Sequence, residues 1–163
     1  MRATRGLFLL GFLFLAPLAV PQAKPPKVLL QILHCAETDK FGLLQPVAKP
    51  DGILRVAWAH KVRTEPYVDE FFIVLYKSAT EGDILVYSRE YAKGKVEFHL
   101  DNNAGFVIRP DKVELIDPLW GMWTRDNITR NVKRAMRGPT YSIPVKTIVA
   151  PLRNVGCYSY PDP

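Results

Sequence analysis

Two cysteines are the residues of this chain best suited to forming a covalent cross-link. Cys35 and Cys157 lie near opposite ends of the sequence that follows the apolar N-terminus. In an oxidising compartment an even pair most simply forms an intramolecular disulfide, although free thiols or an intermolecular bridge would use the same residues. Closing so long a loop contributes about 4–5 kcal/mol in the chain-entropy model. We therefore predict a Cys35–Cys157 disulfide.

Four cations recur at helical spacing near the C-terminal end of the sequence. They are Arg130, Lys133, Arg134 and Arg137. Their spacing of three and four residues places them on one side of a helix, opposite the apolar side chains of the same segment. Such a row suits a polyanion, because each guanidinium can form two hydrogen bonds with a sulfate, carboxylate or phosphate group. The alternative is an ordinary solvated face of an amphipathic helix, which has the same pattern.

One acceptor motif for N-linked sugar occurs in the chain, at Asn127-Ile128-Thr129. Its middle residue is not proline, and the motif lies at the start of the same predicted helix. We predict that Asn127 carries a glycan if the chain passes through the secretory pathway.

The remaining ionisable residues form no motif that indicates catalysis. No two of the three histidines, His34, His60 and His99, lie within twenty residues of each other, whereas a catalytic zinc site takes ligands at close spacing. No serine-nucleophile or phosphate-binding motif occurs. We expect no catalytic residues, no metal and no cofactor, although a hydrolase assembled from residues distant in the sequence is an alternative. Trp120 and Trp123 would be interface anchors if exposed, but burial is expected of such large side chains.

The N-terminus has the three-part layout of a secretory signal peptide. Arg2 and Arg5 precede the apolar run 7–15, which is followed by small residues and prolines up to Ala23. The run is short for a membrane span, so an uncleaved anchor is the less favoured alternative, and no other stretch of the chain has spanning length. We predict that residues 1–23 are a signal peptide and that residues 24–163 form a single secreted domain.

The charge of the chain is moderately positive. Lysine and arginine number 22 against 16 acidic residues, which gives a formal charge of +6 for the whole chain and +4 without Arg2 and Arg5. This balance is compatible with anionic partners outside the cell. We expect an extracellular protein or an acidic polysaccharide as the partner, and no nucleic acid.

The elements that must position these residues are mostly strands. Short apolar or alternating runs, separated by Gly, Asn, Asp and Pro, predict strands at 27–35, 53–60, 71–77, 84–91, 95–100, 105–109, 112–116 and 145–150. Asn102–Gly105 is predicted to be a turn. The exception is 126–137, where the period is helical, Thr124 or Asp126 can cap the start, and Gly138-Pro139 ends the helix.

These patterns together predict a mostly β protein. We expect an antiparallel sandwich or barrel of about 7–8 short strands with one short amphipathic helix near 126–137. The function that fits best is a secreted, non-enzymatic glycoprotein that binds an extracellular macromolecule, with a polyanion on the basic helix face. A structural component of the extracellular matrix without a discrete ligand is one alternative, and a small secreted hydrolase is a second.

Overall fold

The computed structural model describes residues 23–47, 52–63, 68–116, 124–148 and 153–159. Two helices, seven strands and one short 3-10 helix follow one another in this part of the chain. In order they are α1 (Lys27–Thr38), β1 (Ile53–Val62), β2 (Asp69–Tyr76), β3 (Glu81–Ala92), β4 (Lys95–Ile108), β5 (Val113–Ile116), α2 (Arg125–Met136), β6 (Tyr141–Pro144), η1 (Val145–Thr147) and β7 (Val155–Ser159). The prediction of a mostly β protein with a short helix near 126–137 is confirmed.

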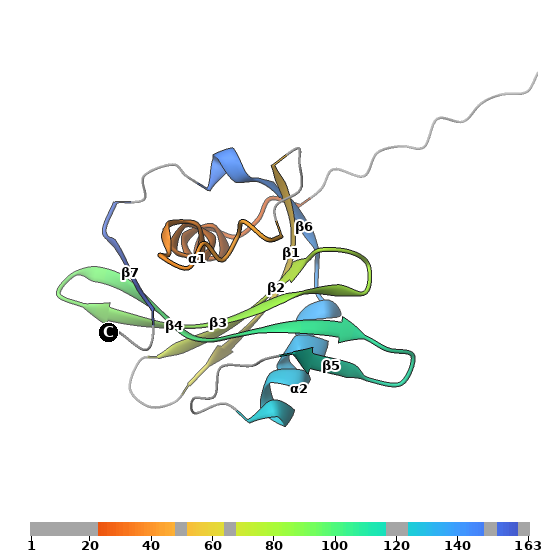
Figure 1. The fold of residues 1–163 in the computed structure, drawn as a ribbon. Coiled ribbons are helices and arrows are strands. Elements are labelled where there is room, and N and C mark those ends of the chain that lie inside the picture. Colours follow the sequence, from red (N-terminus) through yellow and green to blue (C-terminus); the bar gives the residue numbers. More distant parts are fainter. Residues whose placement is uncertain (1–22, 48–51, 64–67, 117–123, 149–152, 160–163) are drawn as a thin grey trace, which may run out of the picture.

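All seven strands belong to one sheet (Figure 1). Six of them lie in the order β5-β4-β3-β2-β1-β6, with antiparallel neighbours throughout. β7 pairs in parallel with the first half of β4, at Val96–Leu100, and β5 pairs with the second half, at Gly105–Ile108. The long strand β4 therefore has two short partners on the same side.

A helix covers each face of the sheet. Figure 1 shows α1 on one side and α2 on the other. Side chains alternate along a strand, so β1 directs Leu54 and Val56 into the core under α1 and Ala57 and Ala59 into the core under α2. The two alanines are small, which lets α2 pack close to β1. β2 is buried along its whole length because both of its faces are covered.

The first element is a helix, and the strand predicted at 27–35 is wrong. Leu29, Ile32, Leu33 and Ala36 follow the helical period and are each 0% exposed. Val28 and Leu30 lie at the margin of that face and are only half-buried. These marginal residues hid the helical period, because an almost continuous apolar run also fits a strand covered on both faces.

The turn predicted at Asn102–Gly105 is also wrong, because these residues lie inside β4. The strand runs for 14 residues, with a bulge where the pairing shifts from Val86 opposite Asn102 to Tyr87 opposite Leu100. Asp101 is the extra residue at this bulge. Asn102 is 1% exposed and is held within the sheet. Sheet pairing overrides the local turn preference of two consecutive asparagines.

The strand predicted at 145–150 is wrong at its first four residues. Val145–Thr147 is a 3-10 helix with Ile148 as its C-cap, whereas the strand β6 comes earlier, at 141–144. Pro144 limits β6 because proline cannot donate to a further ladder hydrogen bond. Residues 149 and 150 lie outside the described part of the chain.

Neither helix among the described residues has both the length and the apolar character needed to cross a membrane.

Candidate functional site

The four cations singled out in the sequence lie together on the outer surface of α2. Arg130, Lys133, Arg134 and Arg137, which we call the basic face, are all exposed. Ile128, Val132 and Ala135 on the opposite side of the helix are at most 1% exposed and pack against the sheet. The predicted opposition of a cationic and an apolar face is therefore present in the fold.

Local interactions explain why this segment is helical. Thr124 has extended backbone angles, and its hydroxyl accepts a hydrogen bond from the Asn127 amide at 3.3 Å, which makes it the N-cap. Asp126 stands in the first turn, and Lys133 and Arg134 stand in the last turn. Both placements complement the helix dipole. The cationic residues thus stabilise the helix that displays them.

The charges of the basic face are not neutralised within the described structure. None of the ion pairs among the described residues includes one of its four side chains. The nearest carboxylate along the helix is Asp126, one turn before Arg130, and it is exposed and forms none of these pairs either. The basic face can therefore offer its charges to an anion from outside.

Asn127 lies at the N-terminal end of the basic face. It is half-buried in the first turn of α2, three residues and so about one turn before Arg130. The backbone carbonyl oxygen of Asn127 accepts a hydrogen bond from the side-chain amide of Asn131 at 3.0 Å. A glycan on Asn127 stays a prediction.

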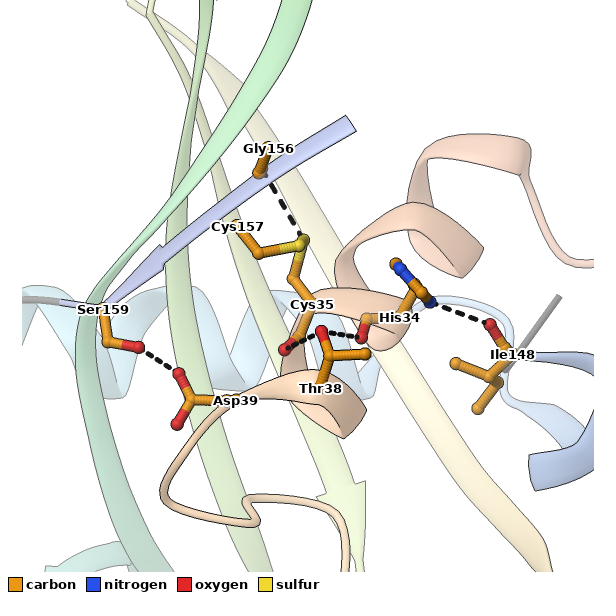
Figure 2. Close-up of a disulfide and its surroundings, with 8 residues drawn as sticks. All are labelled: His34, Cys35, Thr38, Asp39, Ile148, Gly156, Cys157 and Ser159. Atoms are coloured by element: carbon orange, nitrogen blue, oxygen red, sulfur yellow. Dashed lines mark hydrogen bonds between the residues drawn. A yellow bond between two sulfur atoms is a disulfide. The ribbon is translucent and has the colours of Figure 1, made fainter. Parts of the chain in front are cut away.

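The two cysteines lie at disulfide distance, as predicted. Their Cα atoms are 5.2 Å apart and their Sγ atoms are 2.06 Å apart. Figure 2 shows the bond between α1, which contributes the buried Cys35, and β7, which contributes the exposed Cys157. The bond links β7, the last strand in the chain order, to the helix that covers one face of the sheet.

Polar contacts around the disulfide fasten α1 to β7 and to the C-cap of η1 (Figure 2). The Ser159 hydroxyl of β7 donates to the carboxylate of Asp39, the C-cap of α1. His34 Nδ1 lies 3.3 Å from the carbonyl oxygen of Ile148.

A hollow of about 190 Å³ opens beside the disulfide; its lining residues are Thr38, Asp39, Lys40, Cys157, Tyr158 and Ser159. The carboxylate of Asp39 is already occupied by Ser159 and by the amide of Phe41.

The structure does not bring the three histidines together. His34 lies on α1, His60 Nε2 lies 3.0 Å from Asp69 Oδ1, and the His99 ring stacks on Tyr158 at 4.9 Å. Within the described ranges, no group of three or more His, Cys, Asp or Glu side chains is arranged to hold a metal ion.

A polar row that the sequence did not reveal crosses five adjacent strands. Register neighbours from β1, β2, β3, β4 and β7 form it: Lys61, Glu70, Ser88, His99 and Tyr158. The Ser88 hydroxyl donates to Asp101 at 3.0 Å, and Arg63 and Lys61 pair with the buried Glu70. Only the strand register brings these residues together, so their spacing in the sequence could not predict the row.

Glu70, in this row, and Asp101, beside it, have raised pKa values. Burial raises the pKa of Asp101 to about 6, with opposition from the Ser88 hydroxyl and a further increase from Glu70. Burial also raises the pKa of Glu70, although Arg63 and Lys61 oppose the increase. A carboxyl group that titrates near neutrality can transfer protons. Tyr158 is a member of the row that also lines the hollow described above. Lys61, Glu70 and Ser88 are joined to neighbouring side chains by ion pairs and hydrogen bonds.

A second charged cluster lies on the α1 face, near the last residues of β1 and β3 and at the first residue of β2. Asp69 accepts hydrogen bonds from His60 and Arg89. Burial alone would raise the pKa of Asp69, but these two partners lower it. The Arg89 guanidinium lies 5.3 Å from the Phe71 ring centroid and 5.2 Å from that of Tyr91. Because these charges are satisfied by one another, the cluster fastens three strands together.

Trp120 and Trp123, predicted to be buried beside α2, lie outside the described residues, as do most of the residues of the predicted signal peptide.

Comparison of the chain with models of known protein families gives no match, and comparisons with curated proteins and with solved structures give none either. The function must therefore be argued from the surface of this molecule.

Proposed function

We propose that this protein is a secreted glycoprotein that binds an acidic extracellular polysaccharide through the basic face of α2. One observation carries the proposal: four exposed cations share the outer side of a well-capped helix, and no described carboxylate pairs with them. Buried carboxylates elsewhere, such as Glu70 and Asp69, do have cationic partners.

The length of the basic face favours a linear polyanion over a single anion. Arg130 and Arg137 are seven residues apart, which corresponds to about 10 Å along a helix. One sulfate or phosphate group cannot contact cations over that distance, whereas successive acidic groups on a chain can. Arginine, which supplies three of the four cations, also binds planar and tetrahedral anions with two hydrogen bonds.

Secretion and glycosylation are part of the same proposal. The layout of residues 1–23 and the cysteine pair at disulfide distance support an extracellular location. Protein recovered from culture medium should begin near Lys24 and should lose mass when an amidase that removes N-linked sugar is added. A chain with intact Met1 in the medium would contradict processing, and an unchanged mass would contradict the glycan.

Charge reversal on α2 tests the binding function. Replacing Arg130, Lys133, Arg134 and Arg137 with Glu should abolish retention on a heparin column, because the attraction becomes repulsion while the buried helix face is unchanged. Retention of the parent protein should also weaken with added salt, since exposed charges are screened over about 8 Å at physiological ionic strength.

A matched control separates the site from the net charge. Four exposed cations outside α2, namely Lys24, Lys40, Lys95 and Arg153, can be changed to Glu in the same way. This variant has the same formal charge as the first one and should remain on the column. If the α2 variant elutes with the parent protein, the basic face is only solvated; a parent protein that is not retained would favour the matrix component without a discrete ligand.

A further inference from the structure

Arg55 on β1 is an exposed cation whose guanidinium is held in a fixed place. Its Cζ atom lies 4.8 Å from the centroid of the Tyr76 ring on the neighbouring strand. The Tyr76 ring is itself buried and packs edge-on against Phe106, with 6.2 Å between the ring centroids. None of the ion pairs among the described residues includes Arg55. The guanidinium is thus positioned by an aromatic face, and no described carboxylate forms an ion pair with it.

Arg55 lies on the same side of the sheet as α2. Side chains alternate along β1, and Ala57 and Ala59, which share the face of Arg55, belong to the core under α2. The alternation of side chains along β1 therefore places Arg55 on the α2 face of the sheet and not on the α1 face.

The C-terminal end of the basic face leads toward Arg55. Gly138, the residue after Arg137, lies so close to β1 that a methyl group on it would be 3.7 Å from the carbonyl oxygen of Trp58. Trp58 is three residues from Arg55, which is about 10 Å along a strand. Three residues after Gly138, Tyr141 of β6 pairs with Val56, which is the immediate neighbour of Arg55 on β1.

We propose that Arg55 extends the basic face onto the sheet, so that a single anion-binding track runs from Arg130 on α2 to β1. The occupant is a linear sulfated polysaccharide, and this inference rests on the proposed function. About 10 Å along the helix and about 10 Å along the strand give a track of roughly 20 Å, which suits a chain with anions at intervals.

Two features of the arrangement favour a binding role for Arg55. A guanidinium stacked on a ring loses less conformational freedom when it binds an anion, and its planar edge matches a sulfate group. The acceptor motif at Asn127 lies at the opposite end of the track, so a glycan there would leave the Arg55 end open. The alternative is that Arg55 only covers the Tyr76 ring.

The experiment measures the affinity of a heparin-derived octasaccharide by calorimetry at several salt concentrations. Arg55→Ala should weaken binding by about tenfold, because a charge-assisted contact is lost. It should also lower the slope of log affinity against log salt by about one, since one fewer counterion is released on binding. Arg55→Lys should keep the slope of the parent protein but bind more weakly, because the charge remains and the planar, stacked group is lost.

Arg153→Ala is the matched control, since Arg153 is an exposed arginine outside α2 and β1. It should leave both affinity and slope unchanged. Suppose that Arg55→Ala has the affinity and slope of the parent protein while the α2 charge-reversal variant loses binding. This result would overturn the role of Arg55 and leave the proposed function intact. Octasaccharide binding by the α2 variant would instead overturn the proposed function. If Arg55→Ala fails to fold, the affinity of Arg55→Lys tests the proposal. An affinity equal to that of the parent protein would overturn the role of the stacked Arg55 guanidinium.

Discussion

At the scale of single residues, the described charged side chains include two groups, one with ion-pair partners and one without. The buried carboxylates of the sheet are paired: Glu70 with Arg63 and Lys61, and Asp69 with His60 and Arg89. Breaking such a pair would leave a charge away from water, which is costly. The four cations of the basic face have no such partners among the described residues. The first group of charges stabilises the fold, and the second group is available for binding.

Asp101 at the β4 bulge should make stability depend on pH. Its pKa is raised by burial to about 6 in the folded protein, so the folded state binds a proton more readily than the unfolded chain. For such a group the free energy of unfolding falls as pH rises from about 4 to about 6. The loss is at most about 3 kcal/mol, because one pKa unit corresponds to about 1.4 kcal/mol and solvent partly screens a group that is not fully buried.

Asp101→Asn tests this sign directly. The amide is neutral at every pH, and its oxygen can still accept the hydrogen bond from Ser88. The variant should therefore gain stability relative to the parent protein as pH rises from 4 to 7, as measured by chemical denaturation. A difference between the two proteins that stays constant over this range would show that Asp101 titrates alike in the folded and unfolded states.

Residue types and spacing were enough to predict some site residues but not others. The basic face follows from helical periodicity alone, because its members lie within eight consecutive positions of one element. The proximity of Cys35 to Cys157 follows from compartment chemistry. Arg55 and Tyr76, by contrast, meet only through the pairing of β1 with β2, and the bulge that isolates Asp101 depends on the register of β3 and β4. Such contacts require a register that the sequence does not display.

At the scale of elements, α1 shows how an apolar run can conceal its period. A strand covered on both faces would bury Leu30 as fully as Leu33. In the helix, Leu33 is 0% exposed and points into the core, whereas Leu30 is only partly buried. The strands in the middle of the sheet were predictable because their apolar runs lie between polar turns, and α2 was predictable because polar residues mark its outer side.

A pair of leucine substitutions distinguishes the helix from the strand. Leu33→Ala should lower the free energy of unfolding by about 2–5 kcal/mol, as is typical of a fully buried leucine that leaves a cavity. Leu30→Ala removes the same atoms from a half-buried position and should cost clearly less. Thermal or chemical denaturation of both variants checks this order, and equal losses would contradict the helical assignment of 27–38.

At the scale of the whole molecule, the two faces of the sheet have different roles. On one face, α1 is fastened to β7 by the disulfide and by the bond between Ser159 and Asp39 (Figure 2). On the other face, α2 packs on β1 and β2 (Figure 1). The four cations of its basic face are exposed. The covalent link stabilises the fold on the side away from α2, and the α2 side is the surface that we propose for a partner.

The central claim is that a sulfated polysaccharide binds along α2. The most direct measurement is a titration of the isotope-labelled protein with a heparin-derived octasaccharide, followed by amide chemical shifts in NMR spectra. The account predicts shift changes concentrated at residues 125–137 and around Arg55, with α1 and β7 nearly unchanged. Saturating changes centred on α1 or β7 would contradict it, as would an octasaccharide that leaves the amides of α2 unmoved.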